Sequence, residues 1–481
     1  MTEEETMKRP AAFSFILILL AVACAINPVT GRRELALVSE QGEIEMGKET
    51  DAEIAREYGY YGDPELAKYV TSIGLALAPH THRPNLTYHF AVLDTPVVNA
   101  FAAPGGYIYV TRGILALMSS ESELATVLGH ELGHVSARHS VRQLSKMILV
   151  QVGLIVGSAL SDTFAKIAGF AGIGVQLLFL KFSRDDEREA DALGVQYARA
   201  GQFNSGEMVA FFSALQRYGD MAGGHSLPGF LSTHPLTSER IQNVKAMLGE
   251  NDLAFPIQRD TYLNRINNIV YGDDPRQGFI ESGTFYHPAM RFVFNIPQGW
   301  EVQNTPAKVT MAEKNGNAAI VLQAEQSNDD LSAYARTRAS KIEGGQIVNE
   351  QSDRINGLAA YHETYNIVQK DQDTLRARLS FIRKNGYIYT LTQLSKAIDF
   401  NRFDPTFRNI IGSFNELNDP RYLNRQPQHL RVLKADGQRS LKDYLNQNSV
   451  KKEIWTHLAI MNELKDAEAV PGRNQLIKVV R

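Results

Sequence analysis

Cysteine is almost absent from this chain of 481 residues, since Cys24 is the only one. A single cysteine excludes any intrachain disulfide. An excess of positive charge is missing too: the formal net charge is −3, and no long basic run occurs. No nucleic acid is therefore expected as a partner. Because 44% of the residues are hydrophobic and 21% are charged, most of the chain should be globular, with a length that suits two to four domains.

Apolar runs long enough to span a bilayer are also missing. Residues 11–26 are uncharged and largely apolar but short, and Lys8 and Arg9 precede them. This order is typical of a secretory signal peptide. The run ends in Leu-Ala-Val-Ala-Cys at residues 20–24, which resembles the lipobox of bacterial lipoproteins, although Ala21 replaces the commoner Leu.

The lipobox resemblance implies that residues 1–24 are a signal peptide and that Cys24 carries a lipid. Ala25 after the cysteine implies the periplasmic face of the outer membrane rather than retention at the inner membrane. A lipid anchor of this kind would tether the mature protein to the membrane. An uncleaved anchor helix and a plain signal peptide are the alternatives, and Met7 is a second candidate start.

Residues 25–270 predict a mainly α-helical domain with a small β-sheet. Helices are expected at residues 39–58, 63–79, 120–143, 183–201, 206–218 and 235–249, and strands at 86–93 and 106–111. The apolar stretch 147–182 is interrupted by polar residues and glycines. It fits a buried helix pair, a lid, or a membrane-dipping hairpin.

Two further regions follow. Residues 280–418 alternate as strands around a helical stretch at 331–342, which predicts an α+β domain whose pattern resembles the PsbP-like fold. Residues 428–481 predict a β-α-α-β unit that resembles a LysM module, for which peptidoglycan would be the partner; a generic small α+β tail is the alternative.

The sequence His130-Glu131-Leu132-Gly133-His134 is an HExxH motif within a predicted helix. Residues four apart share one helical face, so both imidazoles can bind the same ion. Glu131 beside them can take a proton from water activated by that ion. A catalytic zinc site keeps one position open, so a third protein ligand is expected.

The third ligand is not the metzincin histidine, because Ser140 stands at that position. His139 is expected on another face of the helix. Glu187 and Asp191 are a better pair, since they lie four residues apart on a helix that Ser183 caps. One could bind the metal while the other orients a ligand histidine, but an acidic, solvated helix start explains the same residues.

HExxH followed by Glu187-Arg188-Glu189-Ala190-Asp191 resembles the paired signature of peptidase family M48, a gluzincin family. The likeness covers about residues 27–249 and includes the segment 27–31, which is similar to the secreted lipoprotein branch. The resemblance implies zinc as the cofactor, His130, His134 and Glu187 as its ligands, Asp191 as a supporting residue, and polypeptides as substrates.

A second part of the resemblance concerns substrate binding. The segment Asn99-Ala100-Phe101-Ala102-Ala103-Pro104-Gly105-Gly106 precedes the strand that starts at Tyr107. In the family such a strand lies beside the cleft, which implies that an extended peptide adds to it and that Asn99, Gly105, Gly106 and Tyr107 contact substrate. A plain hairpin is the alternative.

The segment His234-Pro235-Leu236-Thr237-Ser238-Glu239-Arg240 resembles the HPxxxxR segment of the family. The resemblance implies that His234 approaches the metal as a plug or meets the substrate, and that Arg240 steadies the oxyanion. The alternative is a histidine before a helix-opening proline, with Arg240 on the helix surface.

Together these patterns predict a zinc metalloendopeptidase with Glu131 as the general base. The family resemblance implies that its substrates are misfolded or misassembled envelope proteins and that it acts in their quality control. A lipoprotein chaperone or assembly factor, a peptidoglycan-binding protein and an integral membrane protease are the rival hypotheses.

Overall fold

The computed structural model describes residues 24–155, 181–221, 229–340, 342, 344–368 and 373–481. The predicted signal peptide, Cys24 apart, and most of the apolar stretch 147–182 lie outside these residues. Within the part of the chain that the structure describes, no helix is both long enough and apolar enough to cross a membrane.

The chain forms two compact units. Unit 1 comprises the residues up to Ala55, Gly59–Gly272 and Gln428–Arg481, and unit 2 comprises Arg56–Tyr58 and Asp273–Pro427. The segment 428–481, which we expected to be a separate unit, therefore belongs to the same compact body as the HExxH helix.

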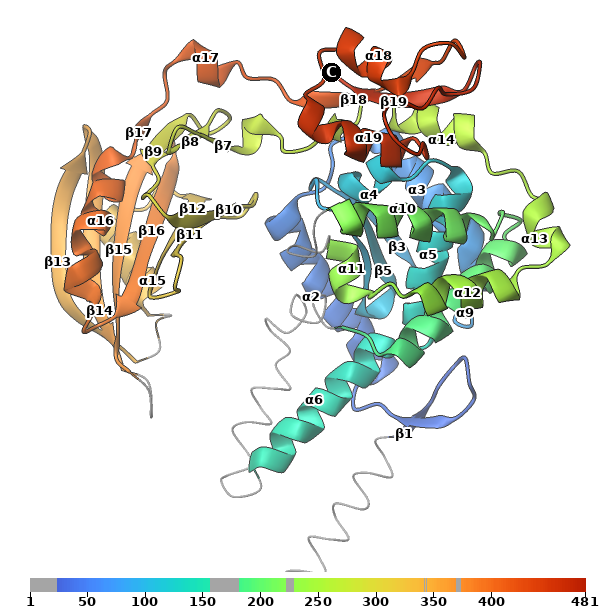
Figure 1. Cartoon of the computed structure of the whole chain (residues 1–481). Coiled ribbons are helices and arrows are strands. Elements are labelled where there is room, and N and C mark those ends of the chain that lie inside the picture. The colour runs from blue at the N-terminus through green and yellow to red at the C-terminus, as the bar shows by residue number, and fades with distance from the viewer. Residues whose placement is uncertain (1–23, 156–180, 222–228, 341, 343, 369–372) are drawn as a thin grey trace, which may run out of the picture. The chain divides into compact units, whose positions relative to one another are not determined.

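Unit 1 is mainly helical, and its centre is the helix that carries HExxH. In Figure 1 the helix α5 (Glu121–Ser136) lies among α3 (Pro64–Leu77), α9 (Arg184–Ala200) and α10 (Glu207–Met221), all of which contact it. Before residue 428 the described part of the unit also contains α2 (Glu40–Tyr58), α4 (Arg112–Leu117), α6 (His139–Ile155), α11 (Gly229–Thr233), α12 (Ser238–Met247), α13 (Glu250–Ala254) and α14 (Arg259–Ile266).

Helix α5 ends earlier than predicted. We expected one helix over residues 120–143, but the helix ends at Ser136, and Arg138 has a φ of 53°. Arg83 donates a hydrogen bond to the carbonyl of Val135 near this end. Helix α6 starts at His139 in a new direction (Figure 1). The break changes which way His139 points.

The small sheet of unit 1 has the order β3-β5-β4, with β3 at His89–Leu93, β5 at Tyr107–Thr111 and β4 at Ala100–Ala103. β5 pairs in parallel with β3 and antiparallel with β4. The prediction that a substrate adds beside β5 is therefore wrong, because both of its edges are already paired.

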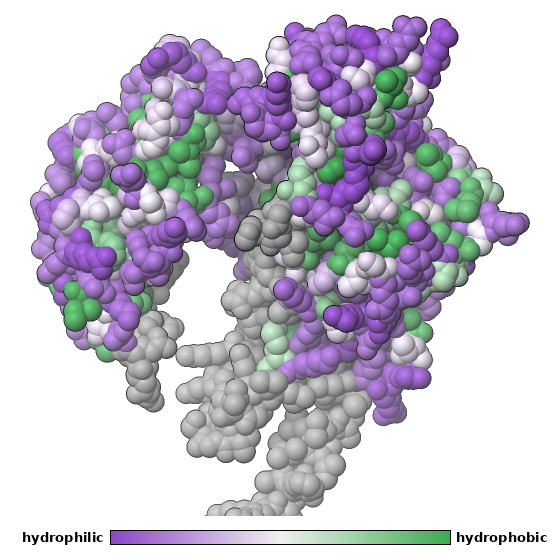
Figure 2. All heavy atoms as spheres, in the orientation of Figure 1, coloured by the Kyte–Doolittle hydropathy of each residue, from purple (hydrophilic) through white to green (hydrophobic). Residues whose placement is uncertain are grey.

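The segment 428–481 has the predicted β-α-α-β order: β18 (Gln428–Lys434), α18 (Leu441–Gln447), α19 (Trp455–Met461) and β19 (Leu476–Val480). β18 pairs with β19 and with β6 (Val270–Tyr271). Leu445, Leu458 and Ile477 belong to the same hydrophobic core as Leu128 of α5. The outer face of the segment, at the top right of Figure 2, is mostly hydrophilic. The LysM-like assignment stays a prediction.

Unit 2 is rich in β-structure, as expected for residues 280–418. A seven-stranded antiparallel sheet has the order β10-β11-β12-β16-β15-β14-β13, and a four-stranded sheet has the order β17-β9-β8-β7. The seven strands are β10 (Trp300–Asn304), β11 (Val309–Glu313), β12 (Ala318–Gln326), β13 (Gly345–Ile355), β14 (Leu358–Ile367), β15 (Leu375–Lys384) and β16 (Tyr387–Lys396).

The four smaller strands of unit 2 are β7 (Phe279–Glu281), β8 (Thr284–His287), β9 (Phe292–Asn295) and β17 (Asn415–Glu416). Two separate hydrophobic cores fill the unit: residues of α16 (Phe400–Ser413) contribute to one and residues of α15 (Leu331–Ala339) to the other. A short helix, α17 (Pro420–Leu423), follows.

Candidate metal centre

Helix α5 presents the motif residues to the interior of unit 1. Its apolar residues pack into the core, and His130, Glu131 and His134 are each no more than 2% exposed. The two imidazoles lie one turn apart on the same face, with their Nε2 atoms 3.1 Å apart. The HExxH helix therefore brings its two histidines together as the spacing predicts.

Helix α9 brings the carboxylate. Ser183 and Asp186 form a capping box at its start, so the helix begins where the sequence predicts. The Oε1 atom of Glu187 lies 3.6 Å from Nε2 of His134, and its Oε2 atom lies 3.7 Å from Nε2 of His130. A residue distant in sequence thus joins the two histidines.

The two helices approach closely because glycines line their contact. A Cβ placed on Gly129 would lie 3.0 Å from the carbonyl oxygen of Gly194, and one on Gly133 would lie 3.1 Å from Cα of Ala190. Both distances are tighter than ordinary van der Waals contacts. Small residues at these positions let the Glu187 carboxylate reach the imidazoles.

A fourth donor comes from the chain between α11 and α12. Nδ1 of His234 lies 2.9 Å from Oε1 of Glu187 and 3.4 Å from Nε2 of His130. The ligand atoms of His130, His134, Glu187 and His234 all lie within 4.8 Å of one another. These four buried residues form a possible metal site.

The donor atoms and the distances between them fit an ion with tetrahedral coordination. Bonds of 2.0–2.2 Å, as zinc makes to imidazole and carboxylate, place neighbouring donors about 3.3–3.6 Å apart. The observed separations among His130, His134 and Glu187 are 3.1, 3.6 and 3.7 Å. The residues present therefore suit a small divalent cation.

Glu131 lies beside the cluster without binding to it. Its Oε1 atom is buried with no hydrogen-bond partner among the described residues, and it lies 3.7 Å from Nε2 of His234. Burial raises the pKa of Glu131, while the nearby histidines oppose that rise. A buried carboxylate with a raised pKa and a free oxygen atom is suited to accept a proton.

Asp191 and Arg240 contact the side chains of the candidate ligands and hold their orientation. Oδ1 of Asp191 lies 3.0 Å from Nδ1 of His130, which leaves Nε2 of that ring directed at the cluster. Nε and Nη2 of Arg240 donate to the two Asp191 oxygens at 2.7 Å, and its Nη1 lies 2.7 Å from Oε2 of Glu187. Arg240 is 4% exposed.

This placement assigns Arg240 a different position from the one expected. We predicted a cation directed at an oxyanion, but the guanidinium group of Arg240 contacts two buried carboxylates. The alternative of a surface arginine is also wrong. Burial raises the pKa of Asp191, but the hydrogen bonds and charges of Arg240 and His130 together outweigh this effect, so the net pKa is lowered.

His139 is a residue that the sequence analysis set aside. Its Nδ1 atom lies 2.7 Å from Nδ1 of His134, and its side chain is fully buried. The expectation that it faces elsewhere assumed an unbroken helix, whereas the chain turns at Arg138. Nothing in the local sequence announces a positive φ at an arginine, although a third histidine close to HExxH was a signal.

The predicted substrate residues have different surroundings in the small sheet and its turn. Gly105 and Gly106 form a buried turn, and a Cβ on Gly105 would lie 2.7 Å from Cα of Ile44 in α2. The ring of Tyr107 stacks on His89, with centroids 4.4 Å apart. Asn99 adjoins β4, whose residue Ala102 provides a backbone hydrogen bond to Glu131. Strand β4 therefore contacts Glu131 through Ala102.

Apolar groups cover the cluster. The ring of Phe182 stacks on His134, with centroids 4.1 Å apart. A cavity of about 220 Å³ opens beside Glu187 with a mainly apolar lining, formed by Phe182, Arg184, Glu187, Arg188, Pro235, Thr237, Glu239 and Arg240.

Comparison with known proteins places this site in a family. Residues 64–248 match peptidase family M48. A beta-barrel assembly-enhancing protease of Yersinia pestis is 30% identical over 228 residues, which are 45% of this chain and 46% of that protein. The protein of that name from Escherichia coli (strain K12) is 30% identical over 213 residues, covering 42% and 43% of the two chains.

The mitochondrial metalloendopeptidase OMA1 of Schizosaccharomyces pombe is 29% identical over 227 residues, which are 46% of this chain and 66% of that protein. The chain thus spans about half the length of the first two relatives. Among solved structures, a cyanobacterial PsbP from Synechocystis sp. PCC 6803 is 12% identical, covers 28% of this chain and 91% of its own, and has a TM-score of 0.24. That likeness assigns no fold, so the PsbP-like pattern stays a prediction.

The matched region contains all four donors of the cluster, the adjacent Glu131 and both residues that hold the ligands from behind. Members of this family are metal-dependent peptidases. Residues 64–248, which hold the whole candidate site, are therefore similar to the metallopeptidases of family M48.

Proposed function

We propose that this protein is a zinc-dependent endopeptidase of the bacterial cell envelope. The observation that carries the proposal is the buried cluster of His130, His134 and Glu187 beside the unpaired carboxylate oxygen of Glu131. Two imidazoles and a carboxylate are a ligand set that catalytic zinc uses in peptidases. Bound zinc supplies Lewis-acid chemistry, since it polarises a carbonyl group and makes water more acidic.

Glu131 is the residue that moves protons in this proposal. Its free oxygen accepts a proton from the attacking water and then passes it to the leaving amine. Burial keeps its pKa above the usual value, so the protonated form is accessible during the reaction. Asp191 and Arg240 hold the ligand side chains in place throughout.

His234 has two roles in the proposal. In the structure its Nδ1 atom occupies the fourth corner of the donor cluster, which fits a resting state closed to substrate. Its Nε2 atom is buried without a partner among the described residues and faces Glu131. Displacement of this ring would open the site and leave the imidazole available to a substrate.

The substrate is proposed to be an extended polypeptide that pairs with β4. This strand lies at the edge of the small sheet, and Ala102 on it neighbours Glu131. Pairing through main-chain hydrogen bonds tolerates many sequences. The apolar cavity beside Glu187 would accept a hydrophobic side chain of that polypeptide.

A role in envelope protein quality control is proposed from two observations. Two similar proteins are named beta-barrel assembly-enhancing proteases. The sequence at Cys24 resembles a lipobox, which would anchor the mature protein by a lipid at the outer membrane. Misfolded or misassembled envelope proteins are the expected substrates. Because the relatives' name includes assembly, a chaperone activity in the same domain is the second candidate.

Casein cleavage by the zinc-loaded protein and by Glu131→Gln separates these two functions. A peptidase loses cleavage by about 10²–10⁴-fold in the variant while it keeps its bound zinc, because Glu131 is not a ligand. The exposed Glu49→Gln, a glutamate of α2, is the matched control and should cleave as the wild type does. Equal cleavage by wild type and Glu131→Gln would contradict the proposal.

A further inference from the structure

A chain of polar side chains runs from the metal cluster to the N-terminal hairpin of unit 1. It starts at His134, continues through His139 of α6 to two carboxylates of α9, and reaches the hairpin through Arg142. Every member is buried or half-buried. A buried polar chain of this kind costs free energy unless its members satisfy one another.

The first link fixes which nitrogen of His134 carries hydrogen. Nδ1 of His134 and Nδ1 of His139 are 2.7 Å apart, so one of them donates and the other accepts. Nε2 of His134 faces the other donors of the cluster and must offer a lone pair to bind a metal. Hydrogen therefore sits on Nδ1 of His134, and His139 is the acceptor.

The second link follows from the first. If Nδ1 of His139 accepts, a neutral ring carries its hydrogen on Nε2. That atom lies 3.1 Å from Oε2 of Glu189 and 3.7 Å from Oδ1 of Asp186, which can only accept when they are ionised. The two carboxylates thus face the nitrogen that must donate, and one consistent set of hydrogen positions satisfies the whole chain.

Helix α9 serves both ligand histidines through two faces. Glu187 and Asp191 lie four residues apart and face His130, while Asp186 and Glu189 lie three apart and face His139. His130 is oriented directly by Asp191, whereas His134 is oriented through an intervening ring.

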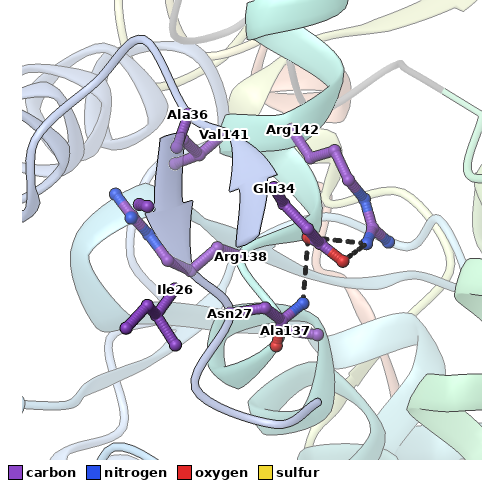
Figure 3. A pocket seen from close by; sticks show the side chains of 9 residues that line it. Ile26, Asn27, Glu34, Ala36, Ala137, Arg138, Val141 and Arg142 are labelled. Carbon is purple, nitrogen blue, oxygen red and sulfur yellow. Dashed lines mark hydrogen bonds and ion pairs between the residues drawn. The ribbon is translucent and has the colours of Figure 1, made fainter. Parts of the chain in front are cut away.

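The outer end of the chain lies on the hairpin of β1 (Cys24–Ile26) and β2 (Arg33–Leu35). Arg142 is hydrogen-bonded to Asp186, and its Nη1 donates to both oxygens of Glu34 at 3.1 and 3.0 Å. Nδ2 of Asn27 donates to Glu34 at 3.0 Å. Figure 3 shows Asn27, Glu34 and Arg142 joined in this way beside the turn at Ala137 and Arg138.

We propose that His139 is a positioning residue that holds His134 in its metal-binding tautomer, and that Glu34 of the hairpin after Cys24 steadies this relay through Arg142. The proposal rests on the proposed metallopeptidase function. It makes the segment next to the predicted lipid attachment part of the support of the metal site.

The test measures Zn²⁺ affinity of the full chain by titration against a competing chelator. His139→Phe should weaken binding by about 10–100-fold, the usual effect of losing the partner of a ligand histidine. His139→Asn should stay close to wild type, because Oδ1 of asparagine can accept from Nδ1 of His134. Glu34→Ala, further from the ion, should lose roughly threefold.

Two controls separate positioning from a general loss of structure. His80→Phe changes an exposed histidine and should leave the affinity unchanged. Urea unfolding of the metal-free forms reports stability. Should His139→Phe fail to fold, His139→Gln replaces it, since its longer amide cannot accept from His134 and should bind as weakly, while His139→Asn binds well.

Nitrogen NMR of the imidazoles gives an independent readout. In the zinc-loaded wild type, Nδ1 of His134 should carry hydrogen, and this signal should shift in His139→Phe but persist in His139→Asn. Wild-type affinity in His139→Phe, or an unprotonated Nδ1 in His134, would overturn the proposal, and wild-type affinity in Glu34→Ala would remove the hairpin from it. Zinc binding without casein cleavage would instead refute the peptidase function alone.

Discussion

At the scale of single residues, Arg240 shows how burial decides a role. It is surrounded by Asp191 and Glu187, two carboxylates that are themselves no more than 1% exposed. One guanidinium therefore balances two buried negative charges: that of Asp191, which contacts His130, and that of Glu187, which belongs to the donor cluster. Its five fixed donors suit this task better than the single ammonium of lysine.

We expect Arg240→Met to lower the free energy of unfolding of the metal-free protein by about 3–5 kcal/mol, because it leaves buried charge unpaired. Zinc should restore part of this loss, since the ion also balances Glu187. Urea unfolding with and without Zn²⁺ measures both effects. An arginine that acted only on an oxyanion would leave stability intact and reduce cleavage alone.

Arg188→Met is the matched control, because Arg188 directly follows Glu187 on α9, yet its ion pairs with Asp185 and Glu239 are exposed. Exposed pairs contribute about 0–1 kcal/mol, so this variant should unfold almost as the wild type does. A loss in Arg188→Met as large as that in Arg240→Met would contradict the assignment.

Residue identity predicted part of the site and not the rest. His130 and His134 follow from spacing along one helix, whereas Glu187 and Asp191 were singled out by the family resemblance, and the structure brings all four together. The partners of Arg240 and His139 depend on how separate elements pack, which spacing along the chain does not encode. His139 in particular depends on a backbone turn at Arg138 that no residue preference announces.

At the scale of elements, the site depends on how closely α5 and α9 approach. Gly129, Gly133 and Gly194 line their contact, and a Cβ on Gly194 would lie 3.0 Å from the backbone nitrogen of His130. Backbone cannot move aside as a flexible side chain does. The separation of the two helices therefore sets the distance from Glu187 to the imidazoles.

Gly129→Ala should push α9 outward by a few tenths of an ångström and raise the Kd for Zn²⁺ by roughly tenfold, because catalytic and binding geometry tolerates shifts of only about 0.5 Å. Gly412→Ala in α16 is the control: a Cβ there meets nothing within 4 Å. It should leave zinc affinity unchanged and slightly favour its helix. Unchanged zinc affinity in Gly129→Ala would show that the site tolerates a larger separation of α5 and α9.

Two helix starts followed local sequence signals, whereas the neighbours of an element in space could not be predicted in this way. Ser39 and Ser183 cap their helices as the sequence predicts. The expectation that a peptide adds to β5 was wrong, because β5 is the central strand of its sheet and has no free edge. Strand order depends on contacts between distant segments, so alternation along one strand cannot reveal whether its edges are free.

At the scale of the whole molecule, the chain returns to unit 1 after completing unit 2. The segment 428–481 looked separate in sequence because its own pattern is complete and because it follows another domain. Its apolar side chains instead extend the core around α5, and Ser119 before that helix donates to the carbonyl of Met461. The segment thus supports the catalytic helix rather than standing apart from it.

Lys478 links the segment to the rest of unit 1 by several hydrogen bonds. It is fully buried, and its Nζ atom donates to the carbonyls of Ala116, Leu117 and Met118 at the end of α4, at 3.1, 3.0 and 2.7 Å. A lysine here satisfies carbonyl groups that the end of a helix leaves unpaired.

Lys478→Met should therefore lower the stability of unit 1 by about 2–4 kcal/mol, because three buried carbonyls lose their donor while the apolar stem is retained. Because the change lies in unit 1, calorimetry should show an earlier transition for that unit, and the transition of unit 2 should keep its midpoint. Lys451→Met, an exposed lysine of the same segment, should change neither transition. If unit 1 of Lys478→Met unfolds at the wild-type midpoint, this contact does not stabilise the unit. Removal of residues 428–481 would then leave the metallopeptidase domain folded.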